Sequence, residues 1–259
     1  YNLSTIPGSD FPDFDVIKSD TTHKITPNKL YELFLKTSFA MANQDWRHYL
    51  NGCLFEKTGS SINMVATDAH RLAIYKSNLE GEGDFTGIVP RKTVIELMKI
   101  LPKQEDEIEF YINSNNIVFM SKKFTFKSKL IDGNYPNYNQ VVPQGEGSKI
   151  TFNRKNMLDS LSRVSVLTSE KFKGVKLKTE SGVLDISAHN PDQESAEEKL
   201  DVTSAGNEFD IAFNVNYLKE VLGTIDEEEI SLISFGSDKS ALVESGDSNQ
   251  VLVLMPLLL

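Results

Sequence analysis

The stretch HKITPNKLYELFLKTSFAM, residues 23–41, has a counterpart in the second half of the chain, SKITFNRKNMLDSLSRVSVL at residues 148–167. A second pair follows in the same order, with TGIVPRKTVIELMKIL at residues 86–101 matched by DIAFNVNYLKEVLGTI at residues 210–225. Identity within each pair is low, but order and spacing agree. Such internal similarity predicts two copies of one structural unit arranged in tandem.

Each copy is predicted to contain two helices. Pro27 and Pro90 suit the first turn of a helix, and Asn153 and Asn214 suit N-cap positions. Apolar residues recur at helical spacing after these starts. The predicted helices cover residues 27–42, 90–101, 153–164 and 214–225.

Between the helices, both halves carry segments in which apolar and polar residues alternate, as in EIEFYI, KFTFKSKLI and EISLISF. These segments are rich in β-branched and aromatic residues, which is typical of antiparallel strands. We therefore predict an α+β fold. The turn-forming GNYP and PQGEGS mark the end of the first unit. The predicted divisions are a lead-in over residues 1–22 and modules over residues 23–143 and 144–259.

The composition is that of a globular protein: 39% of the 259 residues are hydrophobic and 25% are charged. Because Cys53 has no second cysteine to pair with, we expect a reducing compartment, the cytoplasm. The start, YNLSTIPGSD, has neither the basic nor the apolar region of a signal peptide. The final VLVLMPLLL is far shorter than the roughly 20 residues of a membrane span. We expect a fragment or a processed product, since the chain lacks an initiator methionine, and no membrane partner.

The net charge of −10, taken alone, argues against binding to nucleic acid, because attraction to phosphate dominates such binding. The four predicted helices nevertheless carry more basic than acidic residues. Two interpretations stay open at this point. The lysines could belong to ordinary solvated helix faces, or the helices could share one basic surface on an acidic body.

Asp68 and His70 stand close together within the apolar run ATDAHRLAIY. They could belong to a metal-dependent hydrolase acting on nucleic acid, as metal ligands or as an acid–base pair. Three further residues could join them: Asp132, His189 and Asp192. The sequence has no H-x-x-x-H pair, G-x-S-x-G, P-loop or G-x-G-x-x-G motif. We therefore predict a protein that is not an enzyme and needs no cofactor or metal, with the hydrolase as the alternative and a repeat-built cell-surface binding module as a third class.

Seven segments, taken together and in order, resemble the β sliding clamps, the processivity factors of bacterial replicative DNA polymerases. They are VATDAHRLA (65–73), VPRKTVIELMKIL (89–101), KLIDGNYPNY (129–138), TSEKFKGVKL (168–177), AHNPDQESAEEKLDV (188–202), FNVNYLKEVL (213–222) and VLMPLLL (253–259). A protomer of that family has three modules, and two protomers close head to tail into a ring around duplex DNA, with helices lining the hole and sheets outside. The resemblance implies a central clamp module at 23–143, a C-terminal one at 144–259, and the tail of a first module with its linker at 1–22.

The resemblance also implies the function and the partners. A clamp of this family is a non-catalytic subunit that holds a polymerase on DNA by encircling the duplex, and it binds its partners through a hydrophobic peptide-binding groove. The implied partners are double-stranded DNA, the catalytic subunit of the replicative DNA polymerase, the clamp loader, repair and translesion polymerases that bind through short linear peptides, and a second full-length copy in a head-to-tail homodimer.

Carried over by position, the resemblance places the groove on Leu50, Thr67, His70, Arg71, Leu72, Pro136, Val141, Phe172, Asn214, Tyr217, Ser240, Val253, Leu254, Met255, Pro256 and Leu257. Three positions depart from the family pattern. Ala69 stands where the family usually has glycine, and Gln140 and Leu258 stand where arginine is common. If position 69 needs a positive φ, alanine there would be strained.

Two further sets of residues follow from the resemblance. The DNA-facing set is Arg47, His48, Tyr49, Arg91, Lys92, Lys171 and Lys173. The set expected at the interface between protomers is Val166, Leu167, Glu194, Glu197 and Glu198. From the strand pattern around it, Cys53 is expected to be a buried structural thiol.

Overall fold

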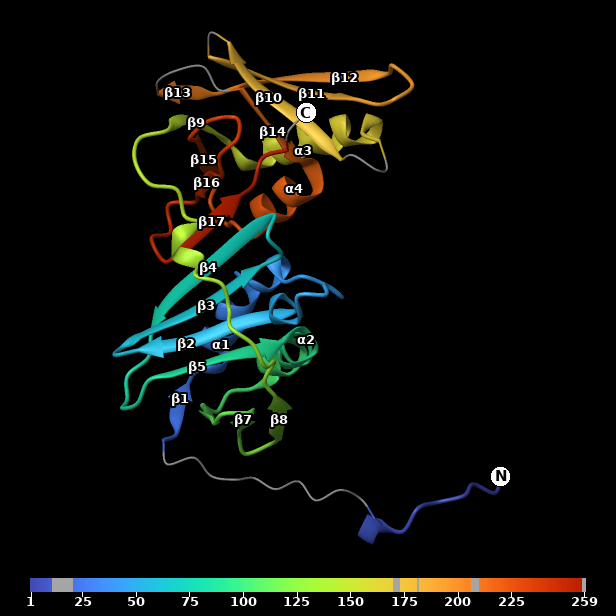
Figure 1. Cartoon of the computed structure of the whole chain (residues 1–259), viewed down its shortest axis with the longest axis vertical. Coiled ribbons are helices and arrows are strands. Elements are labelled where there is room, and N and C mark those ends of the chain that lie inside the picture. The colour runs from blue at the N-terminus through green and yellow to red at the C-terminus, as the bar shows by residue number, and fades with distance from the viewer. Residues whose placement is uncertain (11–20, 170–172, 181, 206–209, 258–259) are drawn as a thin grey trace.

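The computed structural model describes residues 1–10, 21–169, 173–180, 182–205 and 210–257. Two similar repeats follow one another along the long axis of the molecule (Figure 1). The first repeat runs from β1 to η5 and the second from β9 to β17. Residues 1–10 are exposed and extend away from the end of the first repeat. This α+β architecture confirms the fold class and the tandem repeat predicted from the sequence.

The elements of the first repeat are β1 (His23–Ile25), α1 (Pro27–Leu35), η2 (Ser38–Ala40), η3 (His48–Leu50), β2 (Gly52–Thr58), β3 (Ser61–Thr67), β4 (Arg71–Asn78), β5 (Phe85–Pro90), α2 (Arg91–Ile100), η4 (Leu101–Lys103), β6 (Ile108–Ile112), β7 (Asn116–Met120), β8 (Thr125–Lys129) and η5 (Tyr138–Gln140). Those of the second are β9 (Ser148–Asn153), α3 (Arg154–Val164), η6 (Ser165–Leu167), β10 (Gly174–Glu180), β11 (Val183–His189), β12 (Ser195–Asp201), β13 (Thr203–Ala205), β14 (Asp210–Asn214), α4 (Val215–Gly223), β15 (Glu229–Ser234), β16 (Ala241–Glu244) and β17 (Gln250–Leu254). A short η1 (Gly8–Asp10) precedes them.

Side-chain caps start three of the helices. Asn153 accepts a hydrogen bond from the backbone N–H of Asn156, and Asn214 accepts from those of Asn216 and Tyr217. Both N-caps were predicted, and each satisfies donors that the first turn of a helix leaves free. Helix α1 has Thr26 as its N-cap and Pro27 in its first turn, as expected.

The predicted helix bounds differ from the observed ones chiefly at the end of α1 and the start of α2. Helix α1 ends at Leu35 rather than at residue 42. The hydroxyl of Thr37 donates to the carbonyl of Leu33 at 2.7 Å, and the chain then tightens into η2. Pro90 is the last residue of β5 and the N-cap of α2, one position before the first turn. A proline there ends the strand ladder, because it has no N–H to donate.

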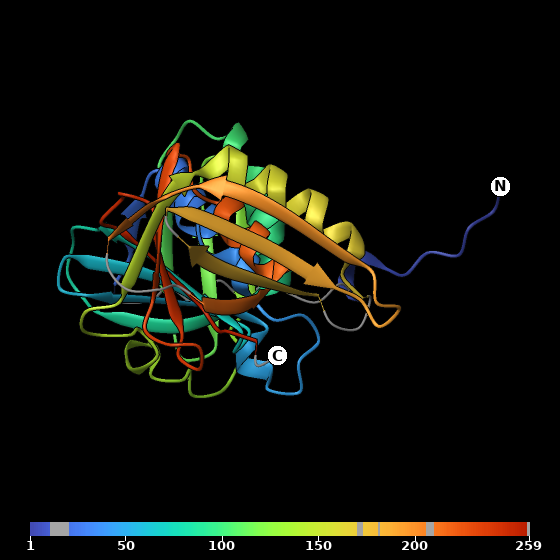
Figure 2. The same cartoon turned by 90° about the horizontal axis from the view of Figure 1, so that it is seen from above.

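The strand orders of the two repeats correspond one to one. Sheet β1-β6-β7-β8 of the first repeat matches the run β9-β15-β16-β17 of the second. The run β4-β3-β2-β5 matches sheet β12-β11-β10-β14 in the same way. Strand β17 also pairs with β4, which fuses two of these runs, together with β13, into one nine-stranded sheet across both repeats. The view along the long axis shows the helices of both repeats on the same side of this sheet (Figure 2).

A large apolar core lies between the helices and the sheets in both repeats. A second, smaller cluster lies on the opposite face of the nine-stranded sheet, where the repeats meet. It consists of Leu54, Val65, Leu72, Ile74, Ile88 and Val253, and the connection between the repeats contributes Ile131, Tyr135, Tyr138 and Val142 to its cover. We call this group the junction cluster.

Candidate functional site

The repeats are joined by an antiparallel ladder between β4 and β17. Its register runs from Gln250 opposite Tyr75 to Leu254 opposite Arg71. Both strands, RLAIYKSN and QVLVL, carry the aliphatic and aromatic residues that suit a strand with little exposed face. The ladder brings the start of β4 and the end of β17, which are far apart in the sequence, to the same place.

A tight turn precedes β4 and is held by its own side chains. Backbone N–H groups of His70 and Arg71 donate to the Asp68 carboxylate at 2.9 and 3.1 Å. The Thr67 hydroxyl donates to the carbonyl of Arg71 and accepts from the N–H of Ala69. Ala69 has a φ of 74°, in the left-handed region that favours glycine. Position 69 therefore requires a positive φ, and the alanine there is strained.

The guanidinium of Arg71 is buried where the two repeats meet. It donates to Asp68 at 3.2 Å, to Glu220 at 2.5 Å and to the carbonyl of Phe39 at 2.8 Å. Its carbon atom Cζ lies 4.6 Å from the centre of the Tyr217 ring. Arg71 thus links the turn before β4, the segment after α1 and the helix α4 of the other repeat. We call these contacts the arginine clasp.

His70 and Tyr217 form an aromatic edge beside the ladder. Their rings stack with centres 5.6 Å apart and planes inclined by 22°. The N–H of Met255 donates to the carbonyl of His70 at 2.9 Å, so the chain leaving β17 stays against this turn. Burial raises the pKa of Tyr217 above its ordinary value.

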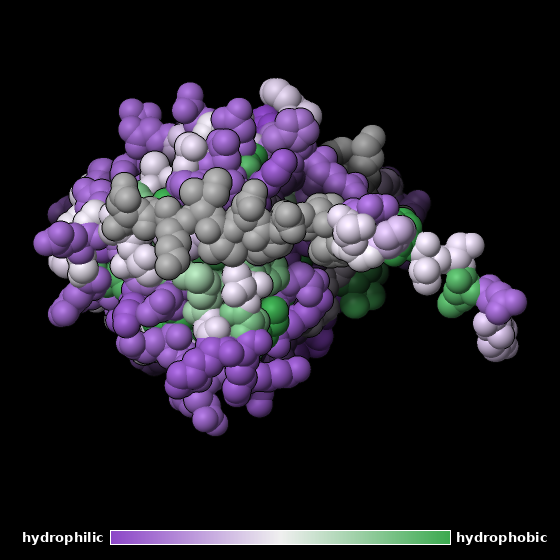
Figure 3. All heavy atoms as spheres, turned by 90° about the horizontal axis from the view of Figure 1, so that it is seen from below, coloured by the Kyte–Doolittle hydropathy of each residue, from purple (hydrophilic) through white to green (hydrophobic). Residues whose placement is uncertain are grey.

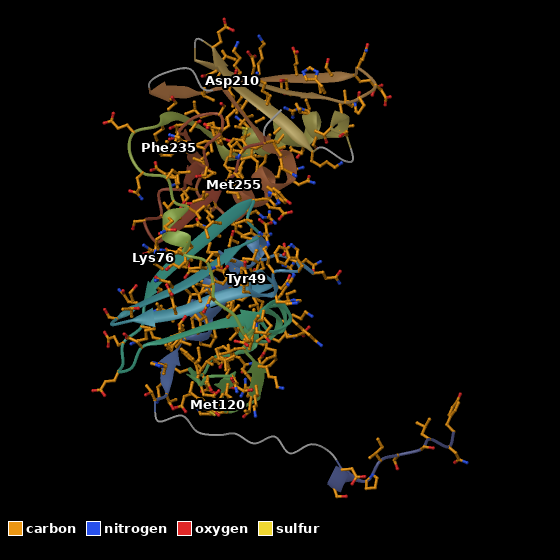
Figure 4. All side chains as sticks on the ribbon, in the orientation of Figure 1. Tyr49, Lys76, Met120, Asp210, Phe235 and Met255 are labelled. Atoms are coloured by element: carbon orange, nitrogen blue, oxygen red, sulfur yellow. The ribbon has the colours of Figure 1, made fainter. Side chains whose placement is uncertain are left out.

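The residues expected in the groove divide into a floor and a rim. Leu72 and Val253 are 2% and 0% exposed and belong to the junction cluster, where direct contact with a peptide had been expected. Val141 is 42% exposed and Met255 is 37% exposed, and Pro136 is exposed nearby. Figure 4 shows Met255 where the two repeats meet. An incoming apolar side chain would meet this rim first.

The remaining residues expected in the groove are buried, are tied to neighbouring backbone groups, or lie outside the described residues. Leu50 and Leu254 are buried. Ser240 donates to the carbonyl of Val141 at 3.2 Å, which ties the connection between the repeats to the end of the 235–240 loop. The N–H of Leu257 donates to the carbonyl of Ala212 at 2.7 Å, and Pro256 is half-buried. Phe172 and Leu258 lie outside the described residues.

A hollow of about 780 Å³ opens beside the clasp, between residues 39–46 and the His70–Tyr217 edge. Trp46 is 82% exposed at its border, and the Arg47 guanidinium lies 5.8 Å from the centre of the indole. An exposed indole and a stacked aromatic pair can both contact a ligand through their faces.

The expected DNA-facing residues have different surroundings. Arg47 donates to Asp45 at 2.8 and 3.0 Å, and these hydrogen bonds lower the pKa of Asp45 to about 2. Tyr49 packs against the junction cluster, and Arg91 donates to the carbonyl of Met41 at 3.1 Å. His48 and Lys92 are exposed, and Lys173 is half-buried. Lys171 lies outside the described residues.

The residues expected at a protomer interface lie on and near β12, at one edge of its sheet. Glu194 and Glu197 are exposed, whereas Glu198 accepts two hydrogen bonds from Arg163, at 2.7 and 2.8 Å. Val166 is exposed on η6, which follows α3, and Leu167 beside it is half-buried. This edge therefore presents backbone groups, carboxylates and one apolar side chain together.

The carboxylate of Asp68 is occupied by the turn and by Arg71, and the ring of His70 is stacked on Tyr217. Within the described ranges, no three His, Cys, Asp or Glu side chains gather closely enough to hold a metal ion. Cys53 is fully buried, as expected, and burial raises its pKa to about 12. No helix in the described part of the chain is long and apolar enough to cross a membrane.

Reasoning from the sequence missed the partners of Arg71. Glu220 lies on the other repeat, and Phe39 takes part through its backbone carbonyl, which leaves no signature in a sequence. It also missed Tyr135 and Tyr138, which cover the junction cluster. Their hydroxyls donate to the carbonyl of Val65 and to the Glu56 carboxylate. Two tyrosines in a turn-rich connection were the available signal, since turns at the surface seldom need large aromatic residues.

Comparison with known proteins gives a consistent result. Residues 24–137 match the family model of the DNA polymerase III beta subunit, central domain, and residues 139–258 match that of its C-terminal domain. A protein of Pseudomonas aeruginosa named "Beta sliding clamp" is 39% identical over 260 residues, which cover 99% of this chain and 71% of that protein. One of the same name from Escherichia coli K12 is 38% identical over 259 residues. The crystal structure of the DNA polymerase III subunit beta from Pseudomonas aeruginosa superposes with a TM-score of 0.95, at 39% identity, over all of this chain and 72% of that one.

Proposed function

The chain belongs to the family of the DNA polymerase III beta subunit, the β sliding clamps, non-catalytic processivity factors of DNA replication, and we propose that it works by encircling duplex DNA and tethering partner proteins to it. The proposed modules are residues 23–143 and 144–259, with residues 1–22 leading into the first. The proposed cellular location is the cytoplasm, where a free buried thiol such as Cys53 stays reduced.

The proposed tethering site is the groove at the junction of the repeats. The observation that carries this proposal is the β4–β17 ladder, which gathers the turn at residues 67–71 and the end of β17 over one apolar floor. Val141 and Met255 are 42% and 37% exposed, so their burial by a ligand contributes less than the roughly 1.5–3 kcal/mol of a side chain that is fully exposed beforehand. The groove suits a short extended peptide with apolar anchors, because such anchors lose water when they pack on this rim.

Specific roles follow for the polar groups. His70 and Tyr217 form an aromatic edge against which a peptide side chain would pack. The guanidinium of Arg71 is buried and occupied, so its role is to hold the turn and α4 in place rather than to contact the peptide backbone. Asn214 acts as the N-cap of α4 and positions Tyr217 in the same way. We propose the catalytic subunit of the replicative polymerase, the clamp loader, and repair and translesion polymerases as sources of such peptides.

The proposed mechanism on DNA is topological. A closed ring stays on the duplex without gripping it, so weak contacts suffice and sliding remains possible. The helices lie on one side of the long sheet and carry Lys92 and Lys155 as exposed basic side chains, while the chain as a whole has a net charge of −10. A weakly basic lining on an acidic body attracts phosphate over short range and limits non-specific binding elsewhere. The β12 edge, with Glu194 and Glu197, is the proposed contact to a second protomer in a head-to-tail ring.

Fluorescence anisotropy tests the groove directly. A labelled peptide of the Gln-x-x-Leu-Phe type is titrated with the 259-residue chain and with a chain that lacks residues 255–259. Saturable binding that is lost on truncation supports the groove. Equal affinity for both chains would refute it, because Met255 would then contribute nothing. A control truncation of residues 1–10, which extend away from the repeats, should leave the affinity unchanged.

A further inference from the structure

Lys36 is a lysine buried where the two repeats meet. It is the C-cap of α1 and is 8% exposed. Lysine side chains normally lie at the surface, and the face of the molecule in Figure 3 is largely hydrophilic. Among the described residues, Lys57 is the only other lysine buried to this degree, and its ammonium donates to carbonyls of its own repeat. A buried ammonium requires acceptors around it, so the partners of Lys36 decide its role.

The side chain of Lys36 crosses from the first repeat to the second. Its Nζ donates to the carbonyl of Thr224 at 2.9 Å and to the carboxylate of Asp226 at 2.6 Å. Thr224 is the C-cap of α4, so the ends of α1 and α4 are joined directly. The helices of both repeats lie on the same side of the long sheet (Figure 2), whereas the junction cluster lies on its opposite face. The repeats are thus held together on both faces of the sheet.

The C-terminal end of α4 is negatively charged within its own repeat. A helix ends in carbonyl groups that have no intrahelical donor, and its macrodipole places partial negative charge there. Basic residues often offset this charge, but the last turn of α4 has none and contains Glu220 instead. Both negative groups find partners in the first repeat, because Glu220 accepts from Arg71 and Thr224 accepts from Lys36. The first repeat therefore supplies the two cations that complete this helix end.

The same helix carries part of the proposed groove. Tyr217, in the first turn of α4, forms the aromatic edge with His70. Thr224 lies about 10 Å further along the helix at 1.5 Å per residue, and Lys36 is not among the described residues that line the hollow beside the clasp. Lys36 can therefore act on the edge through α4 rather than by contact with a ligand.

From these observations we propose that Lys36 is a positioning residue, which holds the C-terminal end of α4 on the first repeat and thereby sets the place of the aromatic edge. Arg71 alone would hold α4 at one point, Glu220. A second contact at Thr224, about one turn later, also fixes the direction of the helix. The consequence for peptide binding rests on the proposed function, whereas the hold on α4 does not.

Hydrogen exchange of the 259-residue chain tests the hold on α4 without any peptide. Lys36→Met keeps an unbranched side chain and removes the ammonium, so the carbonyl of Thr224 loses this donor. Backbone amides of residues 215–225 should exchange severalfold faster than in the wild type. Those of β6 and β7, which belong to another sheet, should keep their rates. Exchange in α4 equal to that of the wild type overturns the proposal.

Lys29 provides a matched control on the same helix. Its ammonium also donates to a backbone carbonyl at 2.9 Å, that of Asn78, but within the first repeat. Lys29→Met changes the net charge by the same amount and should leave exchange in α4 unchanged; equal acceleration by K29M and K36M would reveal a general effect of charge and refute the assignment. The side chain of Asp226 is 89% exposed, so Asp226→Asn should have a smaller effect than K36M. An equal effect would overturn the role given to the carbonyl of Thr224.

Fluorescence anisotropy with the labelled Gln-x-x-Leu-Phe peptide tests the effect on the groove, after circular dichroism has shown that the variants are folded. K36M should raise the Kd severalfold, and K29M should not. Ile117→Ala, which loses stability in the core beside β7, should keep the wild-type Kd, so a raised Kd reports the placement of α4 rather than lost stability. If the wild type binds and K36M binds equally well, the positioning role is refuted. If the wild type does not bind, the proposed function fails, and hydrogen exchange still decides whether Lys36 holds α4.

Discussion

Replacing Met255 and Leu72 by alanine separates the rim of the groove from its floor. Met255 is 37% exposed, so truncation removes part of a surface that a peptide would cover. Leu72 is 2% exposed within the junction cluster, so its truncation leaves a cavity under the sheet. The two variants should therefore fail in different ways, although both residues were assigned to the same groove.

The magnitudes follow from this difference in burial. Truncation of an anchor at a binding surface costs about 1–3 kcal/mol of binding free energy, so Met255→Ala should raise the Kd of the peptide by roughly 5- to 150-fold. Its free energy of unfolding should change by less than that of Leu72→Ala, because 37% of Met255 is already exposed to water. For Leu72→Ala we expect a loss of about 2–5 kcal/mol in the free energy of unfolding, as for other buried Leu-to-Ala changes.

Two measurements on each variant complete the test. Fluorescence anisotropy gives the Kd of the labelled peptide, and urea denaturation followed by circular dichroism gives the free energy of unfolding. Ile117→Ala is a useful control, because Ile117 is fully buried in the large core and lies on β7, in a sheet that contains neither β4 nor β17. It should lower stability without changing the Kd. An unchanged Kd for Met255→Ala would refute the assignment of the rim, and an unchanged stability for Leu72→Ala would refute the assignment of the floor.

Four further predictions follow from single residues. Ala69→Gly should raise the free energy of unfolding by about 0.5–1 kcal/mol in urea denaturation, because the strain of alanine at a φ of 74° exceeds the added freedom of glycine in the unfolded chain; a loss of stability would contradict this. Arg71→Lys should weaken peptide binding severalfold in anisotropy, since one ammonium cannot replace three guanidinium contacts, of which the one to Glu220 crosses the junction; an unchanged Kd would show that the clasp does not position the groove. Cys53, whose pKa is raised to about 12, should react with a thiol reagent at pH 8 only as the protein unfolds, as monitored by absorbance in increasing urea; rapid reaction in the native protein would contradict its burial. The fluorescence of Trp46, the single tryptophan, should change when a peptide reaches the hollow beside the clasp, and Trp46→Phe should abolish the signal; a wild-type spectrum indifferent to saturating peptide would place the ligand elsewhere.

The sequence predicted the fold well where an element depends on interactions between residues close together in the chain. Asn153 and Asn214 were recognisable as caps, because a cap depends on neighbouring backbone groups. The first helix was predicted too long, since apolar spacing continues past Leu35 and gives no sign that Thr37 bonds back to Leu33. Hydrophobic periodicity does not distinguish a continuing helix from a change into a 3₁₀ turn.

For the candidate site, the sequence predicts a set of residues but not their geometry. A resemblance to a family indicates which positions correspond to the family's groove, but it does not indicate which of these residues are exposed. Leu72 and Met255 therefore entered the same set, although one is floor and the other rim. The role of Arg71 depends on Glu220 in the other repeat and on a backbone carbonyl at Phe39, neither of which is encoded near Arg71. The positive φ of Ala69 was the exception, because a glycine preference at one position has a direct conformational meaning.

Because the proposed groove spans the β4–β17 ladder, binding of a ligand there is coupled to the association of the two repeats. A ligand that touches both strands binds the docked state and has no complete site once the repeats separate. At about 100 times its Kd, such a ligand would add roughly 2.7 kcal/mol to the work of pulling the repeats apart. By thermodynamic reciprocity, a change that weakens the β4–β17 pairing lowers the affinity of the ligand by the same factor. A peptide bound in the proposed groove would therefore also hold the two repeats together, and the β4–β17 junction would be least stable after the peptide dissociates.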